Sequence, residues 1–238
     1  MPSSNTFTTT LLPPPNKPLT RPTPTTPTPP TNPQAFNDAF TVRTKVFVDE
    51  QSCSLDEELD ADDPRSWHWV IYDDTKPIAT IRLVPPPHAP HAAFADPAQA
   101  TTLPRYDLQA EPCVRITRVA VLTEYRGNGL GRELVEAALG WAATHGDEIQ
   151  EAYERVIREE EEEGKKKKMM MMGEKEGEGR GSEMGELRRW TGLALAHAQV
   201  SVEKMYVRMG FRTDEPLGRW MEEGIEHVGM WRCVQVCG

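Results

Sequence analysis

The sequence predicts an α/β fold in which a mixed central β-sheet is flanked by helices. Three observations favour this class. Apolar residues recur at three- and four-residue spacing over 36–47, which predicts a helix. Runs rich in β-branched residues at 67–72, 78–84 and 114–121 predict strands. The last run continues through a glycine-rich turn into a second helical pattern, so helices and strands alternate within one domain.

The remaining elements follow from the same rules of periodicity and turn chemistry. The helix that begins near Phe36 runs toward Glu50, and an acidic, proline-terminated loop follows it. The strands at 67–72 and 78–84 form a hairpin. The later elements are a helix at 130–141, a strand at 193–200, a short helix at 202–209 and two closing strands, the second within 227–236.

Composition sets the domain boundaries. Residues 1–33 are rich in proline and threonine and predict a disordered tail, because proline lacks a backbone donor and the segment has little to bury. Residues 34–238 form the single folded domain. It carries a loop insertion at 85–112 and a low-complexity charged insertion at about 146–188, whose blocks of Glu, Lys and Met predict an unpacked segment.

Charge and hydropathy exclude several classes of protein. The net charge of -10 argues against nucleic-acid binding through general positive charge. No stretch reaches the roughly 18 apolar residues of a membrane span, and the N-terminus lacks a secretory pattern. The four cysteines are scattered, which predicts free thiols and no metal site. The expected compartment is the cytoplasm, with the nucleus second.

The glycine-rich turn is the first candidate site. Gly127, Gly129 and Gly131 follow a strand and open a helix, where free N–H groups and the helix dipole favour a phosphate or pyrophosphate. The Lys-Ser/Thr of a Walker loop is absent, and the glycine spacing differs from that of the dinucleotide fingerprint. A helix start without a ligand is the alternative interpretation.

Two motifs in this order resemble those of the GNAT N-acetyltransferases. Arg126-x-x-Gly129-x-Gly131 resembles the family's acetyl-CoA pyrophosphate loop, and YVRMGF at 206–211 resembles its Y-x-x-x-G-F segment. The strings at 42–51, 58–60 and 224–230 are similar to the ElaA-like branch. The resemblance implies the GNAT fold, in which a splayed central strand pair forms the acetyl-CoA cleft. The family's first strand is not clear in this sequence, and part of the Thr-rich segment could replace it.

The resemblance implies acetyl-CoA as acyl donor and assigns its binding residues. Main-chain groups of the central strand would hold the pantetheine arm and polarise the thioester oxygen, and the glycine-rich turn would hold the pyrophosphate. The expected cofactor-binding residues are Val119, Ala120, Val121, Arg126, Gly127, Asn128, Gly129, Leu130, Gly131, Arg132 and Tyr206.

Direct attack by an amine requires a base for the ammonium and an acid for the departing CoA thiolate. The resemblance implies Tyr206 as the acid, and a tyrosine that only packs is the alternative. The central strand lacks the glutamate that many family members place there. Glu50 is therefore the leading candidate for the base, with His68 and His227 as alternatives that would act through water.

The expected reaction is acetyl transfer from acetyl-CoA to the primary amine of a small molecule, by direct attack in a ternary complex. The acidic balance favours a cationic acceptor, which Asp60, Asp62 and Asp63 could attract unless they form a solvated loop. The alternatives are acetylation of a peptide N-terminus or lysine and a non-catalytic acetyl-CoA-binding protein. A faint similarity to acyl-homoserine-lactone synthases is opposed by the intact CoA loop. The resemblance also leads us to expect a homodimer.

Overall fold

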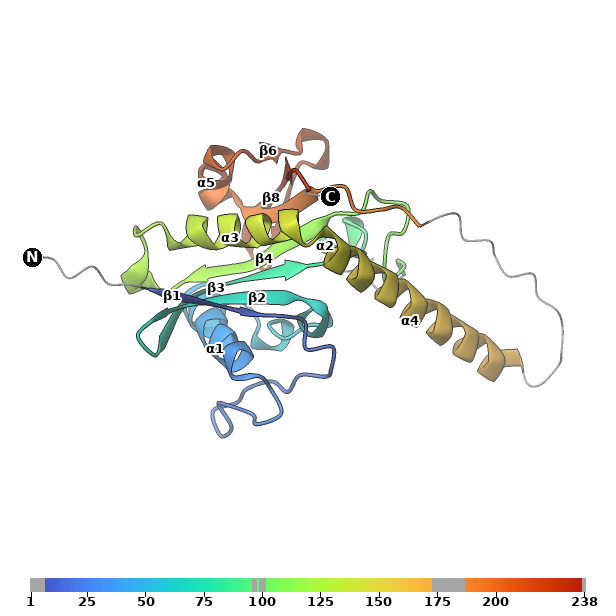
Figure 1. Ribbon diagram of the computed structural model, residues 1–238, viewed down its shortest axis with the longest axis horizontal. Coiled ribbons are helices and arrows are strands. Elements are labelled where there is room, and N and C mark those ends of the chain that lie inside the picture. Colours follow the sequence, from blue (N-terminus) through green and yellow to red (C-terminus); the bar gives the residue numbers. More distant parts are fainter. Residues whose placement is uncertain (1–6, 96–97, 99–101, 173–186, 237–238) are drawn as a thin grey trace, which may run out of the picture.

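The computed structural model describes residues 7–95, 98, 102–172 and 187–236. Its strands form one mixed sheet in the order β1-β2-β3-β4-β5-β8-β6, and β7 pairs with β8 (Figure 1). Among the strands of the described residues, only the β4–β5 pair is parallel. The strands are β1 Thr8–Leu12, β2 Trp67–Asp73, β3 Lys76–Val84, β4 Val114–Val121, β5 Leu193–Gln199, β6 Arg212–Thr213, β7 Arg219–Glu222 and β8 Ile225–Cys233.

Helices cover both faces of the sheet, with α3 on one face and α1 on the other (Figure 1). This arrangement confirms the predicted fold class. The α-helices are α1 Gln34–Arg43, α2 Ala92–Ala95, α3 Leu130–Thr144, α4 Gly146–Met172 and α5 Glu203–Arg208. The shorter helical turns are η1 Thr44–Glu50, η2 Leu55–Glu57, η3 Asp63–Arg65, η4 Thr123–Tyr125, η5 Val200–Val202 and η6 Glu215–Leu217.

The predicted helix toward Glu50 is present, but it changes its winding after Arg43. Residues Thr44–Glu50 form a π-helical stretch, in which the Gln51 N–H donates to the Val46 carbonyl five residues earlier. A π-helical segment of this kind widens the helix locally and is common at functional sites.

The main core lies between α3 and the sheet. Leu134, Val135 and Ala138 of α3 are fully buried against strand residues that include Ile81 and Ile116. Burial of a side chain of this size contributes roughly 1.5–3 kcal/mol relative to exposure. The apolar stripe that the sequence shows along this helix therefore holds it on the sheet and fixes the position of its N-terminus.

The prediction of a disordered tail is wrong for its described residues. β1 pairs antiparallel with β2 along its whole length, and Leu11 packs against the main core. The Thr8–Leu12 segment contains no proline, so it can form the ladder that the surrounding residues cannot. Further along, the buried Asn32 side chain donates to the Thr20 carbonyl and to Asn37, which attaches the segment to α1.

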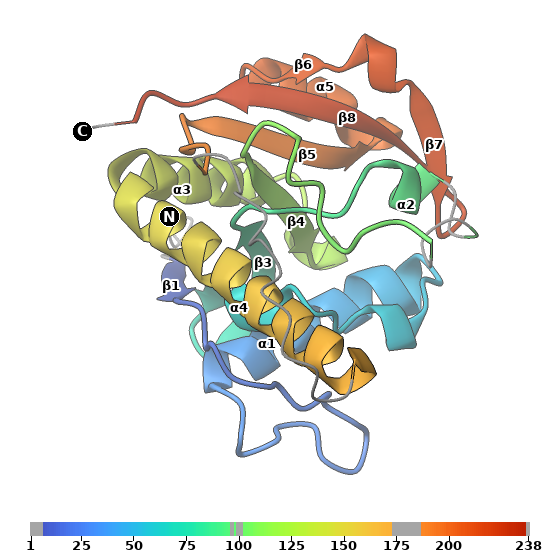
Figure 2. The ribbon, with the colours of Figure 1, turned by 90° about the vertical axis from the view of Figure 1, so that its right-hand side faces the viewer.

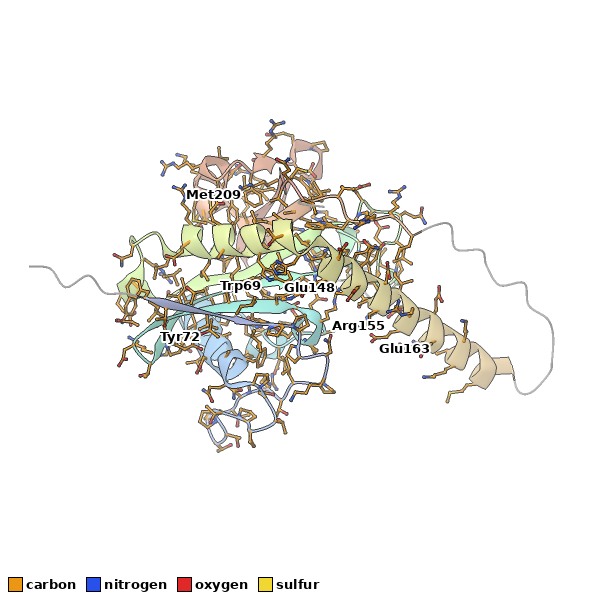
Figure 3. The ribbon with its side chains drawn as sticks, in the orientation of Figure 1. Trp69, Tyr72, Glu148, Arg155, Glu163 and Met209 are labelled. Carbon is orange, nitrogen blue, oxygen red and sulfur yellow. The ribbon has the colours of Figure 1, made fainter. Side chains whose placement is uncertain are left out.

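The charged insertion is also not an unpacked segment throughout. It begins as α4, whose residues Ile149, Tyr153 and Val156 are buried. Their three- and four-residue spacing gives the first part of the helix an apolar side. The distal part projects away from the sheet and carries the labelled Glu163 (Figures 1 and 3). Residues 173–186 of the insertion lie outside the described residues.

The last part of the chain completes the sheet. β5 and α5 lie where the sequence predicts them, and β7 and β8 are the two closing strands, beside α5 and the short additional strand β6 (Figure 2). Cys53, Cys113 and Cys233 are free thiols, as expected, and Cys237 lies outside the described residues. Within the described residues, no helix has the length and apolar character that a bilayer crossing requires.

Candidate active site

The central feature of the site is the parting of β4 and β5. Their parallel ladder joins only three residue pairs and ends at Ile116 and Ala196. Beyond that point β4 continues to Val121 and β5 to Gln199 with no ladder between them. The facing backbone groups of β4 therefore lack strand partners on this side, and an extended ligand could bind them. This is the splayed strand pair that the resemblance of the sequence to the GNAT N-acetyltransferases implies.

A β-bulge lies in β4 just beyond the parting. Thr117 pairs with Arg82 and Ala120 with Thr80, so Arg118 and Val119 together face one residue of β3. Arg118 has a φ of 53°, which is the left-handed region that a non-glycine residue rarely adopts. The bulge interrupts the ladder with β3 at Arg118 and Val119, next to the open edge of β4, and pairing resumes at Ala120 and Val121. Such local strain is found preferentially at functional sites.

The glycine-rich turn connects the end of β4 to the N-terminus of α3. Gly127 and Gly129 have φ values of 83° and 81°, and open space surrounds the position of an added Cβ at both. The Asn128 side chain donates to the Tyr125 carbonyl at 3.0 Å, which holds the turn against η4. Leu130, the first residue of α3, is buried, whereas Arg132 in the same turn is exposed. The turn thus combines free N–H groups with a helix N-terminus, as a pyrophosphate site requires.

The three predicted residues of the central strand lie on both faces of the sheet. Val119 and Val121 pack toward the main core, and Ala120 is buried against Val42 and Val46 of the α1 layer. Only their main-chain groups face along the open edge. The structure therefore places them where the resemblance assigns main-chain contacts and not side-chain chemistry.

Glu50 is bound to the glycine-rich turn. Its carboxylate accepts hydrogen bonds from Thr123 Oγ1 at 2.8 Å and from Arg126 Nη2 at 2.5 Å, and Arg126 Nε also donates to the Val121 carbonyl. Partial burial opposes ionisation of Glu50, but these hydrogen bonds and the Arg126 charge lower its pKa below the ordinary value. A carboxylate held in this way positions the turn and is a poor proton acceptor at neutral pH.

Tyr206 lies on α5, across the parting from β4. Its ring is buried and meets the Phe211 ring edge-on at 5.1 Å between centroids. Burial raises the pKa of its hydroxyl, so the group stays protonated. Its neighbour Met205 lies 3.8 Å from the position of a Cβ on Gly131 in the first turn of α3. The structure thus brings the Tyr206 segment and the glycine-rich turn together from distant parts of the sequence.

The two candidate histidines occupy different environments. His68 is fully buried in β2, where its Nε2 lies 3.1 Å from the Asp63 carbonyl and its ring meets Phe36 edge-on. Burial lowers its pKa to about 4. His227 of β8 is part-buried, and its Nδ1 lies 2.9 Å from the Ile225 carbonyl. Nδ1 therefore donates, which leaves Nε2 as the nitrogen with a lone pair.

The interpretation of Asp60, Asp62 and Asp63 as a site for a cationic amine is wrong. Asp63 binds the buried Arg43 at 2.7 Å and Arg82 at 2.9 Å, Asp60 binds Arg82, and Asp62 binds Arg65. Protein cations therefore already neutralise these carboxylates. We call this ionic network the arginine–carboxylate cluster; its members are Arg43, Arg65, Arg82, Arg115 and Arg118 with Glu58, Asp60, Asp62 and Asp63.

Sequence reasoning missed the arginines of this cluster. Arg82 and Arg115 are buried although each stands in a strand that is otherwise largely apolar. A charged residue inside such a run is a signal that could have found them, since a buried charge requires a partner. Arg118 joins the cluster to the bulge, because it lies 3.2 Å from Glu58 and 3.3 Å from Asp60.

The comparison with known families gives the class of this protein. The profile of the Acetyltransferase (GNAT) family matches residues 34–157, just over half of the chain. The chain belongs to this family. The matched segment contains β4, the glycine-rich turn and α3, and it excludes Tyr206.

Individual proteins resemble this chain over different lengths. A stretch of 51 residues, 21% of this chain, is 43% identical to YjcF, an uncharacterized N-acetyltransferase of Bacillus subtilis (strain 168), and spans 36% of that protein. A solved acyl-CoA N-acyltransferase from Pseudomonas aeruginosa is similar with a TM-score of 0.51 and 21% identity, over 96% of this chain and 100% of that one. Escherichia coli ElaA is also similar, with a TM-score of 0.49 and 19% identity over 85% of this chain and 93% of its own.

Proposed function

We propose that this protein is an N-acetyltransferase that moves the acetyl group of acetyl-CoA to the primary amine of a small molecule. One observation carries the proposal: β4 parts from β5 directly before a glycine-rich turn at the N-terminus of α3. An extended thioester arm and a pyrophosphate need these two features side by side. The YjcF relative, itself an uncharacterized N-acetyltransferase, supports the same activity.

The residues of the site fit acetyl-CoA. The open space around Gly127 and Gly129 leaves room for the pyrophosphate, and the free N–H groups at the start of α3 would bind it. The edge of β4 at 117–121 offers main-chain groups to the pantetheine arm. Residues after the bulge would direct a backbone N–H at the thioester oxygen, which stabilises charge that develops there during attack. Arg126 fixes the position of the turn, because its side chain donates hydrogen bonds to the Glu50 carboxylate and to the Val121 carbonyl.

Two side chains would move the protons of the reaction. The amine must lose a proton before its nitrogen attacks the carbonyl carbon, and His227 is the predicted base with an available lone pair, at Nε2. Glu50 and His68 are poorer candidates because one is held by Arg126 and the other is buried in β2. As the C–N bond forms and the C–S bond breaks, the Tyr206 hydroxyl would donate a proton to the thiolate. The nitrogen, which becomes positively charged on attack, would then lose its second proton, and this proton restores the Tyr206 hydroxyl.

A small acceptor is favoured over a protein. The loop that follows β3 folds back over the sheet beside β5 and leaves a cavity of about 300 Å³ beneath it. A cavity of this size suits a small molecule, whereas an extended peptide would need an open groove along the strands.

The experiment is release of CoA thiol from acetyl-CoA in the presence of amino acids, amino sugars, polyamines and basic peptides, with acetyl-CoA binding measured by calorimetry. We expect binding without an acceptor and thiol release with one class of small amine. Binding without release from any amine would favour a non-catalytic acetyl-CoA-binding protein. No binding at all would contradict the assignment of the site.

A further inference from the structure

The strongest feature outside the acyl-CoA cleft is the cavity beneath the loop that follows β3. It lies on the face of the sheet opposite α3. On β5, Ala194 and Ala196 belong to the core under α3, so the alternate residues Leu195 and His197 face the other way and line the cavity. Apolar and aromatic groups make up much of its wall, including Phe94 and Trp231.

The cavity adjoins the closed end of the parting between β4 and β5. Arg115 lines it and pairs in register with Leu195, one residue before the last pair of the ladder. His197 also lines it and lies one residue beyond that pair. A molecule in the cavity would thus approach the point at which the strands separate from the face opposite to α3.

Arg115 is buried, yet in the part of the chain that the structure describes most of its N–H groups have no hydrogen-bonding partner. It makes one hydrogen bond among the described residues, from Nη2 to Asp62 at 3.4 Å, and its enclosed Nε has no partner. Asp62 is shared with Arg65, which holds it at 2.8 Å. A guanidinium offers five N–H donors, so this side chain has the capacity to bind a carboxylate in a bidentate manner.

The charges around Arg115 also favour the binding of a carboxylate. The arginine–carboxylate cluster contains five arginines and four acids, which leaves one positive charge uncompensated. Burial opposes the charge of all three fully enclosed arginines, but Asp63 and Asp60 keep the pKa of Arg43 and Arg82 above the ordinary value. The pKa of Arg115 is lowered, because burial outweighs the attraction of Asp62. Arg115 is therefore the cluster arginine with the longest carboxylate contact, a single one to Asp62 at 3.4 Å among the described residues.

The other titratable groups of the cavity leave this charge in place. His88 Nε2 donates to the Cys113 carbonyl at 2.7 Å, and burial together with Arg115 lowers its pKa, so the ring is neutral. Burial likewise lowers the pKa of His91 and His197. Asp107 accepts two backbone N–H groups of its own turn. Glu111 pairs with Arg188 at 3.6 Å.

We propose that this cavity binds the acyl acceptor, and that the acceptor is an amine bearing a carboxylate and an apolar side chain, with the carboxylate held by Arg115. The inference rests on the proposed function and specifies its substrate class. It replaces the cationic acceptor expected from net charge, because the local charge at the cavity is positive. Phe94, Leu195 and Trp231 would contact the apolar side chain, and the amine would point toward the parting of the strands.

The test compares matched pairs of acceptors in the CoA-thiol assay, L-phenylalanine against phenethylamine and L-leucine against isoamylamine. Loss of a charge-assisted hydrogen-bonded pair is expected to lower kcat/KM by at least about tenfold for the amine without a carboxylate. Arg115→Gln should remove this preference, so that the variant turns over the amino acid and its matched amine at similar kcat/KM, while its affinity for acetyl-CoA stays the same. Arg115→Lys should recover part of the loss.

A binding measurement separates this inference from the proposed function. Calorimetry with N-acetyl-L-phenylalanine, which cannot react, should show binding that Arg115→Gln weakens by at least about tenfold. If Arg115→Gln does not fold, Leu195→Trp fills the cavity from β5 and should abolish the same binding. Equal thiol release with an amino acid and with its matched amine would overturn the inference and leave the proposed transferase activity unaffected. Binding of the acid without thiol release from any amine would overturn the transferase, and with it the acceptor assignment.

Discussion

The two faces of the sheet around β4 are built from different chemistry. Toward α3, β4 and its neighbours present apolar side chains such as Val114 and Ile116, packed against the helix. Toward α1 the same strands present Arg82 and Arg115, which bind the carboxylates of the acidic loop. The apolar face stabilises the fold through the burial of side chains. The ionic face holds its side chains and backbone in defined orientations, because charged hydrogen bonds require particular geometry. The strained Arg118 at the bulge is anchored to the ionic face.

The largest expected effect comes from a substitution on the ionic face, which is the side of the sheet that carries the arginine–carboxylate cluster. Asp63→Asn removes the charge that Arg43 and Arg82 share in the interior, where all three side chains are nearly inaccessible. Breaking a buried pair by loss of one partner costs roughly 3–5 kcal/mol, because the remaining charge stays uncompensated. The free energy of unfolding from urea titration measures the loss.

The exposed pair between Arg21 and Asp56 provides the matched control. The Asp56 side chain is 82% exposed, and such surface pairs contribute about 0–1 kcal/mol. Asp56→Asn should therefore change the free energy of unfolding little. Equal losses in the two variants would contradict the distinction between a structural ionic face and surface charge.

The next effect is on catalysis and leaves the fold intact. Tyr206→Phe removes the hydroxyl and keeps the ring that packs on Phe211. Loss of a general acid lowers kcat on the order of 10²–10⁴-fold. We expect steady-state kinetics to show this fall while the calorimetric affinity for acetyl-CoA stays the same. A variant with full turnover would show that this tyrosine only packs.

A smaller effect concerns the pH dependence of stability. The pKa of His68 is about 4 in the folded chain, below the roughly 6.5 of an unfolded one. Between these values the unfolded chain binds the proton, so stability decreases as the pH falls. From pH 6.5 to pH 5 the His68 contribution is about 1.5 kcal/mol. Urea titration of wild type and His68→Gln at both pH values measures the difference.

The variant should retain part of the pH dependence, because His88 and His197 also have pKa values lowered by burial. The two proteins should differ by about one proton in the slope of stability against pH. Identical slopes would mean that His68 is not a buried neutral group.

The smallest expected effect is a difference in stability between alanine substitutions at two glycines, one at the start of α3 and one within it. Gly129 has a φ of 81°, so alanine there is strained, at a cost of roughly 1–2 kcal/mol. Gly140 lies within α3 and open space surrounds its Cβ position. Alanine at 140 should stabilise the helix by about 0.5–1 kcal/mol. Acetyl-CoA affinity should fall only for Gly129→Ala, and an equal change in both variants would argue against a special role for the turn.

The sequence predicts features whose determinants lie close together along the chain. The strand before the glycine-rich turn, the stripe of α3 and the Tyr206 segment each follow from a few consecutive residues. The arginine–carboxylate cluster does not, because Arg43, Asp63 and Arg82 come from separate elements and meet only in the folded chain. For the same reason Glu50 looks like a free acid in the sequence, although Arg126 holds it in the structure.

Composition is misleading for two further segments. The proline and threonine content of the first residues hides the five-residue strand β1, whose partner β2 lies far along the chain. The charge blocks of the insertion hide the buried side of α4 at Ile149 and Tyr153. In both segments the composition is an average over a short ordered stretch and its polar neighbours. A prediction of disorder from composition therefore applies to the neighbours alone.

The central claim is that acyl-CoA binds along the open edge of β4 and at the start of α3. Amide hydrogen exchange of the full chain, with and without acetyl-CoA, tests it most directly, because a bound main chain is protected from exchange. We predict slower exchange at 117–121 and 126–132 in the presence of acetyl-CoA, and little change in β1 or β2. Unchanged exchange in both segments, or protection confined to other elements, would contradict the account.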